Sequence, residues 1–484
     1  MVKKDNRKQF LKDFLYTCEK FPNYEFWGHI MDCDISAKAL SDKITCQISL
    51  VSKRLLNYDI DLLEKDNDIE NCHPYFIELI ATMSVEEYKN IKHKYNDTNT
   101  EEVQWVELSL FKTPCKKYKE GKFAYEGHYI YGASPLRRQY VYFVIGETKD
   151  LKKQDEEALK QLATAYDTMK TKIADPLHEK EILTSFYNKI INTHKIKGII
   201  HNVGQANCVE LHFETAKDNF CVMFDVGTSM FEGTGGKGSY IRENWKALRE
   251  VKPQYIVLSH WDIDHIAGIG EIDDDKHTVY DDIKWIAPNI FQLTFSKISI
   301  SAFRLCAYLL DKGNISLIQS NICINNALNY PFKHKGIIVR MFTGNGEQGN
   351  STKNNNIGLC MELLYSHKEN GKMQGVLMPG DCEYSKIREM IHQECEYGFL
   401  IASHHGSNNS QDCNGIFASD NGVAVICTGI NTHGHPGKEH LRNLIASGFE
   451  IHTVYGWHGI SFEIEKGKNE VLVDFITSYV CENT

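Results

Sequence analysis

The segment from His260 to His265 contains four side chains that can bind a metal ion, those of His260, Asp262, Asp264 and His265. They follow the apolar run at residues 255–258, which predicts a short buried strand ending in a polar turn. Open α/β sheets hold their reactive groups just past the carboxyl ends of such strands. Imidazole and carboxylate groups together suit zinc, manganese or iron. The segment therefore predicts a two-metal hydrolase site and leaves the identity of the metal open.

Four more apolar runs end in aspartate or histidine, so five strand ends carry groups of the same kind. A single strand-end histidine carries little information, whereas five such strand ends favour convergence on one site. The other runs, with the polar residues that follow them, are 221–224 with Asp225, 374–378 with Asp381, 398–402 with His404 and His405, and 423–427 with His435.

The chain changes character near residue 195, where we predict a domain boundary. Residues 196–484 contain the apolar runs that end in polar groups. Residues 1–195 are rich in lysine and glutamate, with a predicted strand at 140–145 and an amphipathic helix at 159–173. We therefore expect an amino-terminal α+β accessory domain of unknown type, followed by an α/β hydrolase domain.

Composition narrows the classes of partner and compartment. With 484 residues the chain is too long for one ordinary core, and its net charge of −10 argues against a surface that binds nucleic acid throughout. The charged start is followed by no long apolar stretch, and the fifteen cysteines are scattered. We therefore expect a cytoplasmic protein with free buried thiols and no membrane contact. A solvated face is the favoured interpretation of the local basic clusters, which are Lys116, Lys117, Lys119 and Lys122, and Arg137 with Arg138.

In their order and spacing these motifs resemble the metallo-β-lactamase superfamily, and within it the soluble domain of ComEC-type DNA-uptake proteins and their freestanding relatives. The resemblance covers about residues 196–470 and implies an αββα sandwich with metal ions where the strands end. Nothing comparable covers residues 1–195. The motifs that carry it are the glycine-containing opening at 202–207, Asp225, the H-x-D-x-D-H motif at 260–265, the asparagine run at 354–356, Gly380-Asp381, H-H-G-S at 404–407 and G-H-P at 434–436.

The resemblance implies two divalent ions, zinc or manganese, with magnesium possible. His260 and Asp262 would hold the first ion, and Asp264 and His265 the second. Asp381 would bridge the two ions, and Asp264 or Asp381 would orient the attacking water.

The third ligand of the first ion is not assigned. No histidine between residues 265 and 381 lies in a convincing motif; His277 lies in an aspartate-rich loop, and His334 follows Pro331-Phe332-Lys333. Such a site favours a weakly held ion, manganese or magnesium, over two tightly bound zinc ions.

The resemblance also implies roles for the remaining motif residues. One of His404 and His405 would bind the second ion, because a strand that continues through both would point them in opposite directions. His404 is slightly preferred because it comes first after the apolar run. His435 would lie near the scissile phosphate as a proton donor or a phosphate ligand. The residues expected to support the metal loop or to meet the substrate are Asp225, Asn355, Asn356 and Ser407.

The predicted activity is hydrolysis of a phosphodiester by a metal-bound hydroxide. A nuclease acting on DNA comes first, because the resemblance is to nuclease-type domains, and a role in bacterial defence fits a regulated nuclease. A phosphodiesterase for cyclic or small nucleotides is the first alternative. A catalytically inactive binding or scaffold protein with the same fold is the second. Residues 1–195 would bind a regulatory protein or ligand, and the oligomeric state is left open.

Overall fold

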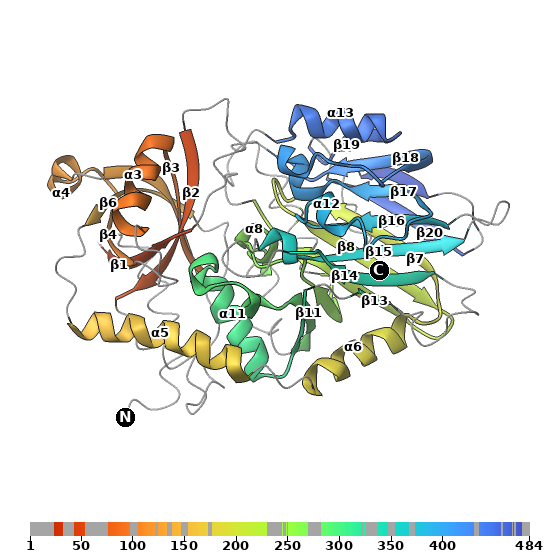
Figure 1. Ribbon diagram of the computed structural model, residues 1–484, viewed down its shortest axis with the longest axis horizontal. Coiled ribbons are helices and arrows are strands. Elements are labelled where there is room, and N and C mark those ends of the chain that lie inside the picture. Colours follow the sequence, from red (N-terminus) through yellow and green to blue (C-terminus); the bar gives the residue numbers. More distant parts are fainter. Residues whose placement is uncertain are drawn as a thin grey trace. The chain divides into compact units, whose positions relative to one another are not determined.

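The structure is a computed structural model, and it describes the following parts of the chain: residues 24–31, 43–53, 76–96, 105–121, 124–132, 138–146, 153–172, 177–229, 244, 248, 250–269, 282–320, 323–325, 337–346, 354–366, 373–429, 435–455, 458–466, 468 and 471–476. The chain divides into two compact units (Figure 1). The first, here called the barrel unit, comprises Met1–Pro176 and Leu293–Gly313. The second, here called the sandwich unit, comprises Leu177–Gln292 and Asn314–Thr484.

The described strands of the barrel unit close into a barrel in the order β1-β2-β3-β5-β6-β4. Every neighbouring pair is antiparallel. Val106, Leu108 and Leu110 are buried at every second position of one strand, as a barrel interior requires. The strands are β1 (Tyr24–Ile30), β2 (Lys43–Ser52), β3 (Phe76–Ser84), β4 (Trp105–Phe111), β5 (Ala124–Gly132) and β6 (Arg138–Gly146).

Four described α-helices belong to the barrel unit: α3 (Val85–Asn96), α4 (Lys116–Glu120), α5 (Lys153–Lys172) and α11 (Ile300–Asp311). The predicted strand at 140–145 lies in β6, and residues 159–172 of the predicted helix lie in α5. Residue 173 lies outside the described residues. Helix α4 carries three lysines of the basic cluster and buries no residue, which agrees with a solvated face. Lys122 and Arg137 lie outside the described residues.

Two sheets form the sandwich unit. The described strands of the first follow the order β12-β11-β10-β9-β8-β7-β20-β21, and those of the second the order β13-β14-β15-β16-β17-β18-β19. The first sheet contains β7 (Thr193–His201), β8 (Cys208–Thr215), β9 (Asn219–Val226), β10 (Tyr255–Val257), β11 (Lys284–Pro288), β12 (Ile315–Ile318), β20 (Gly459–Glu465) and β21 (Leu472–Ile476). The second contains β13 (Cys323–Asn325), β14 (Ile338–Thr343), β15 (Leu359–Ser366), β16 (Met373–Met378), β17 (Cys395–Ile401), β18 (Ala418–Ile426) and β19 (Glu450–Thr453).

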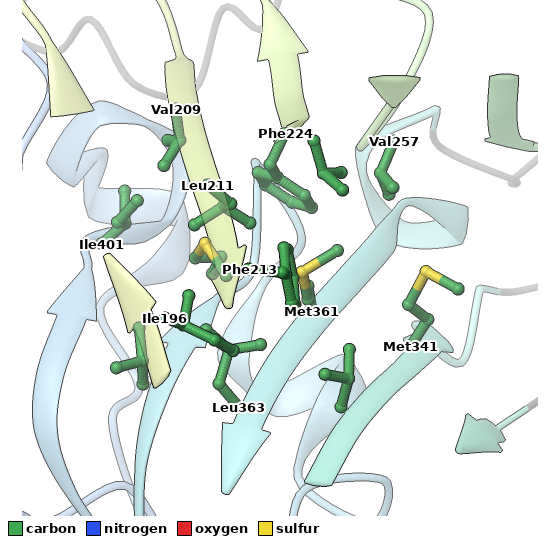
Figure 2. Packing of buried hydrophobic residues seen from close by; sticks show 14 of the residues in the cluster. Ile196, Val209, Leu211, Phe213, Phe224, Val257, Met341, Met361, Leu363 and Ile401 are labelled. Atoms are coloured by element: carbon green, nitrogen blue, oxygen red, sulfur yellow. The ribbon is translucent and has the colours of Figure 1, made fainter. Parts of the chain in front are cut away.

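The main core lies between the two sheets and is filled by the alternate residues of their facing strands (Figure 2). Each fully buried side chain of this size contributes about 1.5–3 kcal/mol relative to an exposed one. A smaller core on the other side of the second sheet includes residues of α12 (Tyr384–Ile387) and α13 (Lys438–Ala446). Core residues labelled in Figure 2 include Ile196, Val209, Leu211, Phe224 and Val257 from the first sheet, and Met341, Met361, Leu363 and Ile401 from the second.

The sandwich unit begins before the boundary predicted at residue 195. Helix α6 (Leu177–Ile190) joins its core, because one face of the helix packs into the cluster between the sheets. That face consists of Ile182, Phe186 and Ile190. Hydrophobic burial therefore assigns α6 to the unit that follows it.

The segment Leu293–Gly313 was also not anticipated as part of the amino-terminal unit. Its helix α11 is buried along almost its whole length, and Ser299 caps the helix by accepting a hydrogen bond from the backbone N–H of Ala302. Ser301 donates to the Glu78 carboxylate at 2.6 Å, and the Ile300 N–H donates to the Ser49 hydroxyl at 2.9 Å. These bonds attach the segment to β2 and β3.

The direction of the strands brings the polar groups together. In the first sheet β9, β10, β11 and β12 run parallel, and in the second β16, β17, β18 and β19 do so. Parallel strands present their carboxyl ends at one edge.

Among the described residues, no helix is long and apolar enough to cross a membrane. Ten cysteines of this part are free thiols, and nine of them are buried.

Candidate metal centre

Asp381 stands at the centre of the converging groups. It follows β16 after Gly380, and its side chain is only 4% exposed. Its Oδ1 lies 3.3 Å from Nε2 of His265, a residue that follows β10 of the first sheet. Its Oδ2 lies 3.6 Å from His404 Nε2 and 3.8 Å from His405 Nε2, both from the second sheet. The two sheets therefore meet at this carboxylate, as the strand-end pattern predicted.

Asp262 and Asp264 lie on different sides of Asp381, as expected for ligands of two different ions. Asp262 Oδ2 lies 3.2 Å from His260 Nε2, and Asp264 Oδ2 lies 3.4 Å from His405 Nε2. Both carboxylates are more exposed than Asp381. Helix α8 (Ile263–Ile266) separates them, because Asp262 precedes the helix and Asp264 lies within its turn.

Asp225, at the end of β9, orients two imidazoles. One of its oxygens accepts from His265 Nδ1 at 2.8 Å and from the Ser259 hydroxyl at 2.8 Å. The other accepts from the Ser259 N–H at 2.6 Å. Because that hydroxyl donates to Asp225, its oxygen is free to accept from His260 Nδ1, 3.0 Å away. Both histidines thus carry a proton on Nδ1 and turn Nε2, which bears the lone pair of the neutral ring, toward Asp381.

His404 and His405 play different parts. His405 Nδ1 donates to the carbonyl of Cys427 at 2.9 Å, which leaves its Nε2 lone pair facing Asp264 and Asp381. His404 Nδ1 instead faces the amide nitrogen of Asn355 at 3.5 Å. An amide nitrogen only donates, so the neutral His404 ring carries its proton on Nε2. The geometry therefore favours His405 as the metal ligand, contrary to the slight preference for His404.

The reason for this difference is the backbone after β17. The strand ends at Ile401, and Ser403–Gly406 form a short 3-10 turn in which His404 and His405 have φ values of 50° and 52°. This left-handed region is costly for residues other than glycine and is found at functional sites. Because the strand does not continue, both imidazoles reach Asp381. The expectation that they point in opposite directions was wrong.

The ligand atoms fit a metal ion. Among the residues that the structure describes, His260 Nε2, His265 Nε2, His405 Nε2 and Asp381 Oδ1 are buried atoms with no hydrogen-bond partner. Two ligand groups arise, His260 with His265 and Asp381, and Asp264 with His265 and His405, each with its atoms within 4.8 Å of one another. Buried lone pairs directed at one point are costly unless a cation or a donor satisfies them. The arrangement therefore suits two divalent ions near Asp381.

Electrostatics separates the protonation states of these groups. Burial works against the ionised form of Asp381, but the charges of His265, His404 and His405 hold the pKa of its carboxyl well below the usual value. For His265, burial is outweighed by Asp381, Asp225 and Asp264, which raise the pKa of the imidazole well above its usual value. Burial lowers the pKa of His404. Asp381, Asp225 and Asp264 thus surround His265 with negative charge, which favours a proton or a bound cation at its Nε2.

Several residues singled out in the sequence do not reach the centre in the expected way. The Asn356 amide bonds Glu383 through its oxygen and its nitrogen, and the Ser407 hydroxyl accepts from the Asn409 N–H in the following turn. Both are buried. Asn356 joins the loop before β15 to the segment after β16, and Ser407 stabilises the turn that follows it. His435 lies beside His404, with ring centroids 5.7 Å apart. His277 and His334 lie outside the described residues.

Two further residues belong to the site: Ser259, which was not singled out, and Asn354, the first residue of the asparagine run at 354–356. Ser259 links Asp225 to His260, and its position directly before the H-x-D-x-D-H motif was the signal that could have indicated this. Asn354 donates to Asp262 Oδ1 at 2.6 Å from the loop before β15. Gly380 packs against Ser259 so closely that a Cβ on it would lie 2.4 Å from the serine Cβ. The contacts of Ser259 therefore require glycine at 380.

Comparison with known proteins supports this description. Residues 201–280 match the family model of the metallo-beta-lactamase superfamily, and this stretch includes His260, Asp262, Asp264 and His265. No curated protein matches the chain. The match, together with the two facing sheets and the ligand cluster, supports a hydrolase of the metallo-β-lactamase fold for the sandwich unit.

Three solved structures are weakly similar. The metallo-beta-lactamase fold protein YhfI from Bacillus subtilis shows 11% identity and a TM-score of 0.32, over 58% of this chain and 100% of that chain. Unliganded yeast PDE1 shows 9% identity and a TM-score of 0.27, over 56% and 99% respectively. AidC, a dizinc quorum-quenching lactonase, shows 12% identity and a TM-score of 0.24, over 57% and 81%. At these scores the likeness carries no argument about substrate.

Proposed function

We propose that the sandwich unit is a metal-dependent phosphodiester hydrolase that cleaves DNA, of the ComEC-like branch suggested by its motifs. The observation that carries the proposal is the set of unpartnered imidazole nitrogens around Asp381, with an aspartate in the second position of the H-x-D-x-D-H motif. His260, Asp262 and Asp381 would hold one ion. Asp264, His265, His405 and Asp381 would hold the other.

Two ions in these places would activate water and neutralise charge on a phosphate. The residues around them supply the remaining functions. Asp264 is partly exposed and offers an acceptor that orients the attacking water. His404 carries its proton on Nε2 and can donate to a phosphate oxygen that sits beside Asp381. His435, whose ring lies beside that of His404, would donate a proton to the leaving oxygen.

The test is a substrate panel with purified full-length protein. Single-stranded DNA, double-stranded DNA, RNA, a cyclic dinucleotide and a generic phosphodiester are incubated with manganese, zinc or magnesium. We expect DNA cleavage that His260→Ala and Asp381→Ala both abolish. His194→Ala, which alters an exposed histidine on β7, should leave the rate unchanged.

Each outcome separates the proposal from its alternatives. Hydrolysis of the cyclic dinucleotide without cleavage of DNA would assign a small-nucleotide phosphodiesterase. Bound metal without hydrolysis of any phosphodiester would favour a binding protein with this fold. Activity that persists in both variants would remove the centre from the mechanism altogether.

A further inference from the structure

A second group of metal-competent side chains lies on the opposite side of the first sheet from its core. Glu210 and His212 alternate with core residues of β8, so both point away from the sandwich interior. Cys221 on β9 is the direct cross-strand partner of His212. Side chains at such a pair have Cβ atoms about 4.5–5.5 Å apart. Sheet register therefore brings a carboxylate, an imidazole and a thiol together.

The ligand atoms of these three residues all lie within 4.8 Å of one another. Tetrahedral zinc holds sulfur, nitrogen and oxygen ligands at about 2.0–2.3 Å, so only small side-chain movements are needed to close the group on an ion. Two histidines already contact the Glu210 carboxylate, one at each oxygen. Its Oε2 accepts from His201 Nε2 at 2.9 Å, and its Oε1 contacts His212 Nε2. One oxygen can thus bind an ion while His201 holds the other in place.

Two of the three ligands are buried, and the third is accessible from solvent. The side chain of Glu210 is 7% exposed and Cys221 is buried, whereas the side chain of His212 is 45% exposed. An ion can therefore arrive past His212 and meet the two buried ligands. A hydrogen-bonded row of two histidines and one glutamate would account for His201, Glu210 and His212. It does not account for a thiol at the same point.

We infer that Glu210, His212 and Cys221 form a separate cation site with one thiolate ligand, suited to zinc or another thiophilic divalent ion. Thiolate and imidazole ligands together select zinc over magnesium or calcium. Cys221 precedes Asp225 by four residues on β9, about 13 Å along the strand. The site is therefore distinct from the centre at Asp381 and does not depend on the proposed activity.

Cobalt distinguishes the two sites, because only this one supplies sulfur. Metal-free full-length protein, kept reduced, is titrated with Co²⁺ and followed by absorption. We expect a thiolate-to-cobalt charge-transfer band in the near ultraviolet that saturates at one equivalent and is lost on addition of Zn²⁺. Cys221→Ser should remove the band and one equivalent of bound cobalt. Cys395→Ser, at another buried strand cysteine, should retain both.

Folding of each variant is checked by circular dichroism and thermal melting. If Cys221→Ser does not fold, His212→Ala serves in its place, because this side chain is half exposed; it should weaken the band-forming affinity about tenfold or more. The inference is overturned if saturating cobalt produces no thiolate band in the wild-type protein. It is also overturned if the band survives Cys221→Ser, or if His212→Ala binds with unchanged affinity.

Discussion

Asp225 is the residue on which the orientation of two metal-facing imidazoles depends. Its carboxylate accepts from His265 directly and from His260 through Ser259. In Asp225→Asn one oxygen becomes a donor, so this set of hydrogen bonds cannot form and the rings lose their fixed tautomer. We expect metal affinity to fall about 10- to 100-fold, measured by equilibrium dialysis. Asp218→Asn, an exposed aspartate on the turn before β9, is the matched control and should bind normally. Unchanged affinity in Asp225→Asn would contradict this account.

His404 and His405 provide a second contrast at the residue scale. His405→Ala removes a nitrogen lone pair that faces Asp264, so we expect the loss of one bound ion. His404→Ala removes a proton donor, so the protein should keep both ions and hydrolyse its substrate more slowly, by about 10²-fold or more. Metal content by mass spectrometry and the turnover rate are measured on the same preparations. The reverse pattern, with the ion lost from His404→Ala, would assign the ligand role to the first histidine.

The ligand types of this centre could be predicted from the sequence, but the choice between neighbouring histidines could not. Strand ends, spacing and residue types located Asp225, His260 and Asp381. The role of His405 depends on a left-handed backbone turn and on the carbonyl of Cys427, which is 22 residues further along the chain. Neither feature leaves a signal in a local pattern.

At the scale of elements, the contact between β3 and α11 includes a buried carboxyl, that of Glu78, whose titration changes the stability of the barrel unit. Burial raises the pKa of Glu78 to about 7, and the hydrogen bonds from Ser301, Gln47 and Ser49 offset only part of that effect. The folded barrel therefore prefers the neutral acid. This preference stabilises the unit fully below about pH 4.5 and is lost as the pH rises through about 7, a change of about 3 kcal/mol.

The prediction is tested by urea unfolding near pH 5 and near pH 8. The free energy of unfolding of the wild-type barrel should fall toward pH 8 relative to that of Glu78→Gln, which stays neutral throughout. Glu120→Gln, an exposed glutamate on α4, should follow the wild type. A constant difference between wild type and Glu78→Gln at the two pH values would show that Glu78 is ionised in the folded state at both.

Elements were predictable where the sequence marks their ends. In the sandwich, an aspartate or histidine lies within three residues of the end of β9, β10, β16 and β17, so these strands are recognisable as apolar runs that lead to polar groups. In the amino-terminal part only β6 was recognised as a strand, because the other strands of the barrel carry polar residues such as Glu78 and Ser49 on buried positions. Their partners come from α11, more than 200 residues away.

The chain of the whole molecule passes between its two units three times, at residues 176/177, 292/293 and 313/314. A cut between the units at the first crossing therefore leaves the second and third intact. The segment Leu293–Gly313 remains connected to the sandwich unit at both ends while it packs in the barrel unit. Ten of the twelve residues of α11 are buried, and each large apolar side chain among them contributes about 1.5–3 kcal/mol by burial.

We therefore expect the two units to stay associated after cleavage at that crossing. A protease site introduced between Pro176 and Leu177 is cut in the purified protein, and the fragments are run on size exclusion with and without urea. They should co-elute under native conditions and separate in urea, because α11 leaves the barrel only when the barrel unfolds. Uncut protein is the control for elution volume. If the fragment 1–176 separates without denaturant, α11 is not held in the barrel, and the assignment of this segment to the amino-terminal unit fails.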